Sequence, residues 1–215
     1  MNDTFEKVCI VGLGLIGGSI GLAIKRSNIS NQITGYARSN STLERAIELG
    51  LVDSVRDNLK DAVNNSDLVI LATPLSTFRE LVEEMSPFLK KGCIITDTGS
   101  AKLTVIEDLK DILPNGVEFV PGHPIAGTEE SGPDAGFAEL FDNRWCILTP
   151  TEDNSSNAVD LVKDFWESIG SKVEIMDPMH HDKVLAITSH IPHLIAFNIV
   201  GTANNLANIT EKEVV

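Results

Sequence analysis

Three glycines near the N-terminus have the spacing of a phosphate-binding turn. Gly12, Gly14 and Gly17 form a G-x-G-x-x-G pattern between an apolar β-type run and a helical one. In that context the pattern predicts a dinucleotide site, in which the first two glycines shape the turn and the third packs helix on strand. Leu15 and Ile16 supply the first helical amides, which favour anions. A P-loop is excluded because no G-K-[ST] follows, and the alternative is a turn without a ligand.

The second strand bears on the choice of cofactor. NAD sites usually end this strand with Asp or Glu, which binds the ribose 2′-hydroxyl. Here Ala37 takes that place, with Arg38, Ser39 and Thr42 following. Loss of the carboxylate and gain of Arg38 favour a 2′-phosphate, so NADP is the preferred prediction over NAD. Alternatively, Arg38 only stacks on adenine and either cofactor is accepted. The predicted cofactor site also includes Thr73 and Pro74.

Histidines and a serine stand in three polar clusters, TDTGSAK (96–102), VPGHPIAGTEESG (120–132) and SHIPHLIAFN (189–198). Ser100 and His123 follow predicted strands, and ligand sites in open α/β sheets gather at the carboxyl ends of strands. A neutral histidine is a suitable general base near pH 7. His190 and His193 share one helical face. The alternatives are a structural loop histidine at 123 and a His190 that only caps or packs.

These clusters need a layered α/β frame. Strands are predicted at 7–11, 32–36, 67–72, 92–96, 118–120, 145–148 and 172–176. Helices are predicted at 17–27, 42–48, 76–88, 102–112 and 155–169. The alternation predicts a Rossmann-type, doubly wound, mainly parallel sheet over residues 1–176. The apolar runs DLVILA and CIITD are typical of strands buried on both faces.

The pattern changes near residue 177. Residues 178–206 form one helical pattern in which Pro178 fits a helix start and Pro192 should kink or locally break the helix. We therefore expect an all-helical domain to begin within residues 177–215. Residues 210–213 have the T-x-x-E form of a capping box, which suggests that the polypeptide was once longer.

Composition narrows the function classes. The 215 residues carry 17 Lys and Arg against 31 Asp and Glu, a net charge of −14, and the lack of a basic run argues against nucleic acid as a partner. Three separated cysteines in apolar runs indicate buried thiols in a cytoplasmic protein. The uncharged run 8–24 has an acidic start and internal glycines, unlike a signal peptide, and no other stretch is expected to span a membrane.

Taken together, GLGLIGGS, TDTGSAK, GHPIAGTEESG and SHIPHLIAF resemble the prephenate/arogenate dehydrogenase family of tyrosine biosynthesis, in order and spacing, over essentially the whole chain. The resemblance implies NAD(P)-dependent oxidative decarboxylation of prephenate to 4-hydroxyphenylpyruvate, or of arogenate to tyrosine. It implies that His123 binds the C4 hydroxyl proton and that Ser100 positions His123 and the nicotinamide. His193, with His190 and Ser189, is implied to bind substrate, and Glu129 to gate the loop.

The resemblance also implies a homodimer built on a helical domain that carries a substrate-binding arginine beyond the last residue here. The expected alternatives are a truncated, impaired dinucleotide-binding module, or another two-domain dehydrogenase of the β-hydroxyacid type. His180, His181 and Asp182 are not predicted to bind a metal, since adjacent helical histidines diverge and no third ligand is evident. We expect them to face solvent or to support the site from behind. Trp145 and Phe197 are expected in the core.

Overall fold

Residues 5–210 are described by a computed structural model, and their side chains through residue 206. The larger sheet has six parallel strands in the order β3-β2-β1-β4-β5-β6. Its strands are β1 (Phe5–Val11), β2 (Ser30–Tyr36), β3 (Ser54–Arg56), β4 (Leu68–Leu71), β5 (Ile94–Asp97) and β6 (Glu118–Val120). This order confirms the predicted doubly wound fold, whose ligand crevice lies where the strand order reverses, between β1 and β4.

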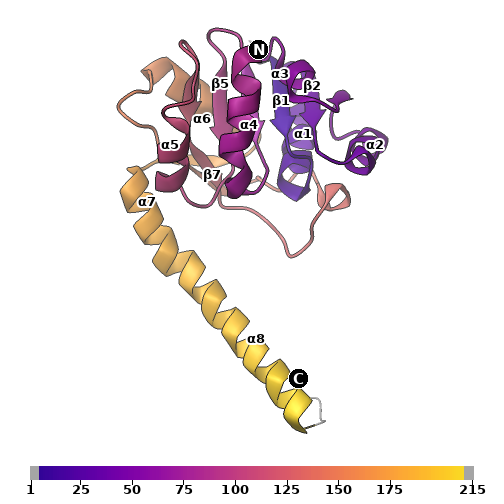
Figure 1. The fold of residues 1–215 in the computed structure, drawn as a ribbon, viewed down its shortest axis with the longest axis vertical. Helices are drawn as coiled ribbons and strands as arrows, with labels where there is room; N and C mark the ends of the chain where they lie inside the picture. The colour runs from indigo at the N-terminus through magenta and orange to yellow at the C-terminus, as the bar shows by residue number, and fades with distance from the viewer. Residues whose placement is uncertain (1–4, 211–215) are drawn as a thin grey trace.

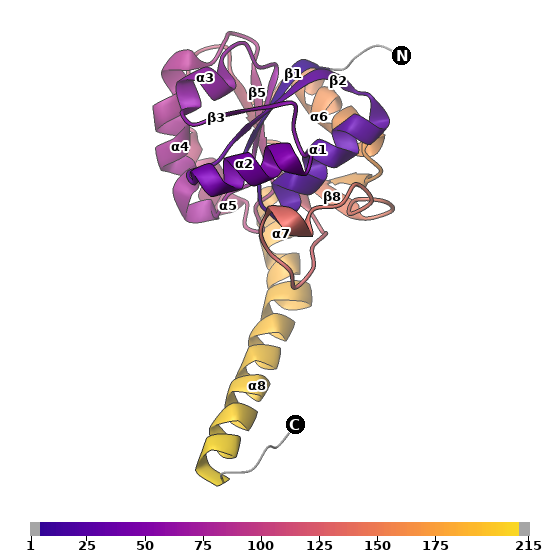
Figure 2. The ribbon, with the colours of Figure 1, turned by 90° about the vertical axis from the view of Figure 1, so that its right-hand side faces the viewer.

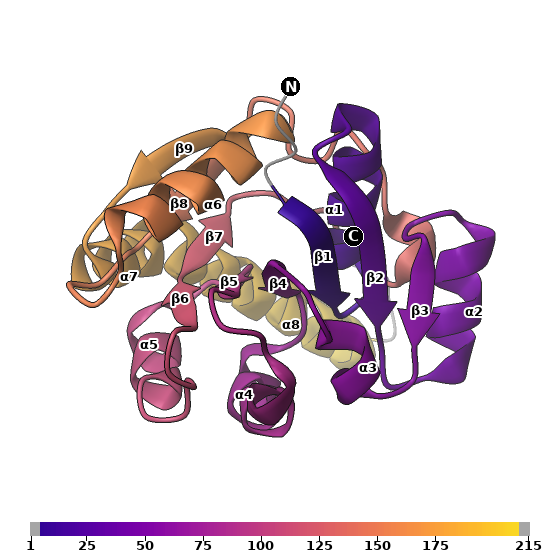
Figure 3. The same ribbon diagram turned by 90° about the horizontal axis from the view of Figure 1, so that it is seen from above.

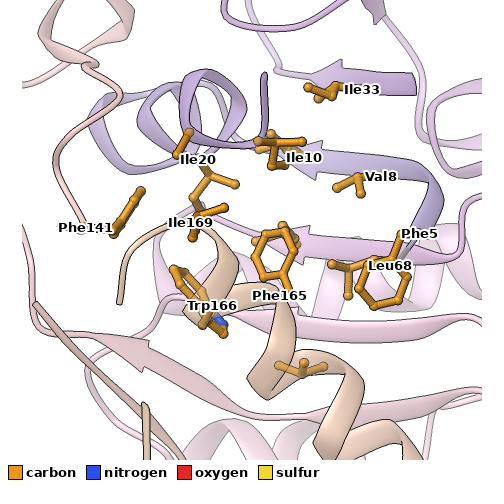
Figure 4. Packing of buried hydrophobic residues seen from close by; sticks show 14 of the residues in the cluster. Phe5, Val8, Ile10, Ile20, Ile33, Leu68, Phe141, Phe165, Trp166 and Ile169 are labelled. Atoms are coloured by element: carbon orange, nitrogen blue, oxygen red, sulfur yellow. The ribbon is translucent and has the colours of Figure 1, made fainter. Parts of the chain in front are cut away.

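Helices cover both faces of that sheet (Figure 3). They are α1 (Leu15–Ser27), α2 (Asn40–Glu48), α3 (Leu59–Val63), α4 (Phe78–Met85), α5 (Leu103–Leu109), α6 (Ser156–Ser168), α7 (Pro178–Leu185) and α8 (Ile191–Thr210), with 3-10 turns at Leu75–Thr77, Ser86–Phe88 and Pro133–Ala135. One face packs on α1 and α6, where Phe165 and Trp166 meet Ile10 and Ile20 (Figure 4). The other face packs on α3, α4 and α5 through residues such as Phe78.

A second sheet was not predicted as a separate unit. It contains β7 (Gly122–Pro124), β8 (Trp145–Leu148) and β9 (Lys172–Ile175), with β7 antiparallel to β8 and β8 parallel to β9. Pro121 alone separates β6 from β7, and since proline has no amide N–H to donate, it suits the point where the chain changes sheets. This change of sheet places His123 in the middle of β7, so the residue belongs to a strand instead of a loop.

α7 and α8 form one long rod that leaves the α/β body (Figures 1 and 2). The Asp177 side chain caps α7 by accepting a hydrogen bond from the amide of His180. Ala186–His190 form a π-helical turn just before Pro192, and this wider turn accommodates a residue that cannot donate a helical hydrogen bond. The predicted local break is therefore a π turn. The capping box at 210–213 lies outside the residues whose side chains are described.

The rod is apolar and poorly covered. Among the described residues, Pro178–Leu206 is the one helix long and apolar enough to cross a membrane, with a mean hydropathy of 1.5, and very little of its apolar stretch is buried. The expectation that no further stretch has this character was wrong, because after Lys183 the rod contains no Asp, Glu, Lys or Arg through residue 206. Its many exposed apolar side chains call for a covering surface.

Candidate active site

The glycine turn has the geometry that the sequence predicts. Gly12 has φ of +102°, and a Cβ there would lie 2.5 Å from the carbonyl oxygen of Ala72. A Cβ on Gly17 would lie 1.8 Å from the carbonyl oxygen of Gly12, so only glycine fits where the helix packs on the turn. Gly14 has nothing within 4 Å of its would-be Cβ, and it precedes α1 without a capping side chain. The first turn of α1, Leu15–Gly17, therefore begins at open space that can admit a phosphate.

A cavity lies beside this turn, at the carboxyl ends of β1, β2 and β4. Its walls include the predicted cofactor residues Gly12, Gly14, Ala37, Arg38, Ser39, Thr42, Thr73 and Pro74. The Ser39 hydroxyl accepts a hydrogen bond from the Thr42 amide and so caps α2. Glu80 and Glu84 of α4 also line the cavity, and sequence reasoning did not include them. These acids oppose a 2′-phosphate, whereas Arg38 favours one.

A second cavity, of about 970 Å³, gathers the predicted catalytic and substrate residues. It is lined by Ser100, His123, Glu129, Ser189, His190 and His193. Leu185, Phe137 and Phe197 add apolar surface. Phe197 is 76% exposed and Trp145 is 50% exposed, so the expectation that both lie in the core was wrong. The α/β body and the rod thus contribute opposite walls to one cavity.

His123 is nearly enclosed, at 9% exposure. It pairs with Ile147 across the second sheet, which fixes its backbone. Burial, followed by the Lys102 cation and the rings of His181 and His190, lowers the pKa of His123 to about 3, with only Asp182 acting in the opposite direction. The imidazole is therefore neutral near pH 7 and can accept a proton at one nitrogen.

The side chain that contacts His123 is His181, which sequence reasoning left outside the site. His123 Nδ1 lies 2.9 Å from His181 Nε2, and the rings meet edge to face with centroids 5.1 Å apart. His181 is fully buried, so the expectation that it faces solvent was wrong, whereas support from behind the site fits; His180 is exposed. Among the described residues no hydrogen bond joins Ser100 to His123. An adjacent histidine pair in sequence gives no sign of which ring turns inward.

A buried ion pair holds the strand that carries His123. Lys102 Nζ lies 2.5 Å from Asp97 Oδ2 and donates to the carbonyl oxygen of Gly122 at 2.7 Å. Asp97 accepts hydrogen bonds from the amides of Gly99 and Gly122. Both charged side chains are fully buried. In the TDTGSAK cluster, sequence reasoning selected Ser100 only. The opposite charges of Asp97 and Lys102, which flank Ser100, were the available signal for this ion pair.

The second cavity is also lined by an arginine that the sequence motifs do not point to. Arg144 lines it, and its guanidinium forms no ion pair within the part of the chain that the structure describes. Of the three acids that line the cavity, Asp142 and Glu139 already lie 2.5 Å and 3.8 Å from Arg26, and Glu129 forms no ion pair with Arg144. Arg144 is thus available for an anionic ligand.

Comparisons with known proteins agree with this geometry. Residues 20–175 match the family model for the nucleotide-binding domain of prephenate dehydrogenase. Residues 177–214 match the model for the dimerization domain of prephenate dehydrogenase.

Individual relatives extend the match. A cyclohexadienyl dehydrogenase of Zymomonas mobilis is 46% identical over 92% of this chain and 67% of its own length. A prephenate dehydrogenase of Bacillus subtilis is 34% identical over 97% of this chain, which spans 57% of that protein. The crystal structure of A. aeolicus prephenate dehydrogenase with hydroxyphenyl propionate and NAD+ superposes with a TM-score of 0.86 at 37% identity, covering 93% of this chain and 70% of that one.

The glycine turn, the two cavities and these matches lead to one conclusion: the chain belongs to the prephenate/arogenate dehydrogenase family.

Proposed function

We propose that the protein carries out NAD(P)-dependent oxidative decarboxylation of prephenate or arogenate, the final oxidative step toward tyrosine. The observation that carries this proposal is the 970 Å³ cavity in which a neutral, nearly enclosed His123 faces Ser100 and His193. Relatives named prephenate and cyclohexadienyl dehydrogenase support the same activity. The structural relative that holds hydroxyphenyl propionate and NAD+ supports a ligand pair of this chemistry.

In this proposal the protein orients the substrate and handles one proton. His123 accepts a hydrogen bond from the C4 hydroxyl and takes its proton as the C4–O bond gains carbonyl character. A nicotinamide cofactor held at the glycine turn would supply the acceptor for the hydride that leaves C4. The C1–carboxylate bond breaks, CO₂ leaves, and its electron pair enters the ring, which becomes aromatic as His123 returns the proton to oxygen. Ser100 and His193 hold the ring so that these changes occur in one geometry.

Substrate anions need cations in a chain of net charge −14. Arg144 is available because Arg26 occupies the neighbouring acids, so we assign it a substrate carboxylate. Glu129, exposed in the same cavity, would repel the keto acid side of prephenate and attract the ammonium of arogenate. Reduced-cofactor formation, measured with both substrates and both cofactors in a matrix, identifies the preferred pair.

The activity test compares the unmodified chain with His123→Asn. We expect the substitution to remove most of kcat while cofactor affinity, measured by calorimetric titration, is unchanged. Cofactor binding without turnover of either substrate by the unmodified chain would favour an impaired dinucleotide-binding module instead. Near-normal turnover by His123→Asn would remove the histidine from its proposed role.

For the cofactor, we propose a preference for NADP through Arg38, Ser39 and Thr42. Arg38→Ala should lower kcat/KM for NADP+ by about 10-fold or more, the scale of one charge-assisted contact, and change that for NAD+ much less. Glu80→Gln should act in the opposite direction, because it removes a negative charge from the same cavity. A strong preference of the unmodified chain for NAD+ would contradict the proposal.

We further propose a cytoplasmic homodimer in which a second copy covers the rod. Leu194, Ile195 and Ile199 are each more than half exposed and lie on one apolar stripe of α8. The dimerization-domain match over the rod supports this assignment. Light scattering should give a dimer mass, and Ile195→Asp with Ile199→Asp should give a monomer. A monodisperse monomer before substitution, or partition of the chain into vesicles, would contradict it.

A further inference from the structure

Asp182, His181 and His123 form a continuous chain of polar contacts that reaches the cavity. Asp182 Oδ1 lies 2.8 Å from His181 Nδ1, and His181 Nε2 lies 2.9 Å from His123 Nδ1. We propose that Asp182 and His181 are positioning residues that fix the proton arrangement of His123 and leave its Nε2 lone pair free for the substrate hydroxyl. This inference deepens the proposed dehydrogenase activity and rests on it.

The proton arrangement follows from which atoms can donate. A carboxylate only accepts, so the contact with Asp182 requires a proton on His181 Nδ1. In a neutral His181 the other nitrogen, Nε2, then has no proton and must accept. Its contact with His123 therefore requires a proton on His123 Nδ1. A neutral His123 with that proton has a bare Nε2, the form that a general base needs.

The opposite arrangement would disable the base. If His181 were a cation, both its nitrogens would donate, His123 Nδ1 would have to accept, and the proton of His123 would sit on Nε2. Burial lowers the pKa of His181 below its ordinary value, although Asp182 raises it, so the neutral form prevails. The other groups that face the pair are Asp97, the last residue of β5, Lys102, the residue before α5, and His190 of the π turn.

Asp182 is itself held in the charged form and in place. Burial would raise the pKa of its carboxyl, but hydrogen bonds from the Lys102 and Leu103 amides and from His181 bring the pKa below the ordinary value. At the start of α5, the Lys102 amide donates a hydrogen bond to Asp182 Oδ1 at 2.9 Å, and the Leu103 amide donates one to Oδ2 at 3.0 Å. One carboxylate thus anchors α7 to the α/β body and orients the histidine pair. The rod that carries His193 is positioned by the same contact.

A purely structural role would predict different results. If His181 only filled space, Phe in its place would preserve the volume and cost little activity. The positioning role instead predicts that His181→Phe loses about 100-fold or more in kcat, the scale of general-base catalysis, with little change in cofactor affinity. His181→Gln, whose amide oxygen can still accept from His123 Nδ1, should retain more of kcat than His181→Phe. The matched control His180→Phe alters the exposed neighbour and should stay within about twofold.

NMR can detect directly which ring nitrogen of His123 carries the proton. Long-range ¹H–¹⁵N correlation spectra of the histidine rings, recorded on the unmodified chain near neutral pH, should show His123 protonated at Nδ1 and bare at Nε2. In His181→Phe this preference should be lost. A His123 protonated at Nε2 in the unmodified chain, or full kcat in His181→Phe, would overturn the inference. Absence of turnover in the unmodified chain would overturn the proposed activity instead, and the ring spectra would still decide the proton arrangement.

Discussion

Lys102→Met tests how the fold holds its catalytic strand. The Lys102 ammonium is fully buried between Asp97 and the carbonyl oxygen of Gly122, the residue before His123. Met keeps much of the chain length but removes the charge and both contacts. Asp97 would then retain its two amide donors but lose its counter-charge.

The expected loss of unfolding free energy in Lys102→Met is large, because the charge of Asp97 remains buried without a partner. Removing one partner of a buried pair typically costs about 3–5 kcal/mol. Domains are stable by roughly 5–15 kcal/mol, so this loss removes at least about a fifth of the total stability. At about 2–4 °C per kcal/mol for a protein of this size, the midpoint of thermal unfolding should fall by roughly 6–20 °C. Since Lys102 lowers the pKa of His123, its loss should also raise that pKa.

Urea unfolding followed by circular dichroism measures the free energy, and histidine NMR titration measures the pKa. Lys110→Met is the matched control, because Lys110 pairs with Glu107 on an exposed helix surface, and this substitution should leave the urea unfolding midpoint nearly unchanged. Adding Asp97→Asn to Lys102→Met should recover part of the loss, since no uncompensated charge remains. A Lys102→Met protein within 1 kcal/mol of the unmodified chain, roughly the value of an exposed pair, would refute the reasoning.

Three further predictions follow from the two cavities. Arg144→Ala should raise KM for prephenate by about 10- to 100-fold, as expected for a charge-assisted contact, whereas Lys163→Ala on the distant α6 surface should not; equal KM values would exclude Arg144 from substrate binding. Because the folded chain resists protonation of His123 to about pH 3 while an unfolded histidine titrates near 6.5, the unfolded state binds more protons in that window, and stability falls as pH falls through it. Between pH 7 and 5 this residue alone should cost about 2 kcal/mol, measured as the difference between the unmodified chain and His123→Asn in urea unfolding; parallel curves would contradict it. Gly14→Ala should weaken cofactor binding without lowering the unfolding midpoint, since its Cβ enters open space. Gly17→Ala should lower both the cofactor affinity and the unfolding midpoint, because its Cβ meets the carbonyl oxygen of Gly12. Equal midpoints in the two variants would show that the turn is more adaptable than its contacts indicate.

Sequence reasoning worked best where the signal is local. The glycine turn, the strands beside it and the start of α7 at Pro178 depend on backbone freedom, burial periodicity and capping within a few residues. It failed for β7, which has three residues and includes a glycine and a proline, because such a strand exists only through its partner β8. Sequence reasoning did not expect the rod to be apolar over a length sufficient to cross a membrane, because uncharged polar residues interrupt the run without making it hydrophilic.

The sequence by itself therefore determined the α/β class, the dinucleotide turn and the family, because each of these depends on residue types at short, fixed spacings. Tertiary structure alone decided what touches His123. His181 lies 58 positions away along the chain, Lys102 binds the carbonyl oxygen of Gly122 across 20 positions, and Arg144 lines the same cavity from the residue before β8. Such contacts depend on how separate elements pack, and no local periodicity records which of two adjacent histidines turns toward the sheet.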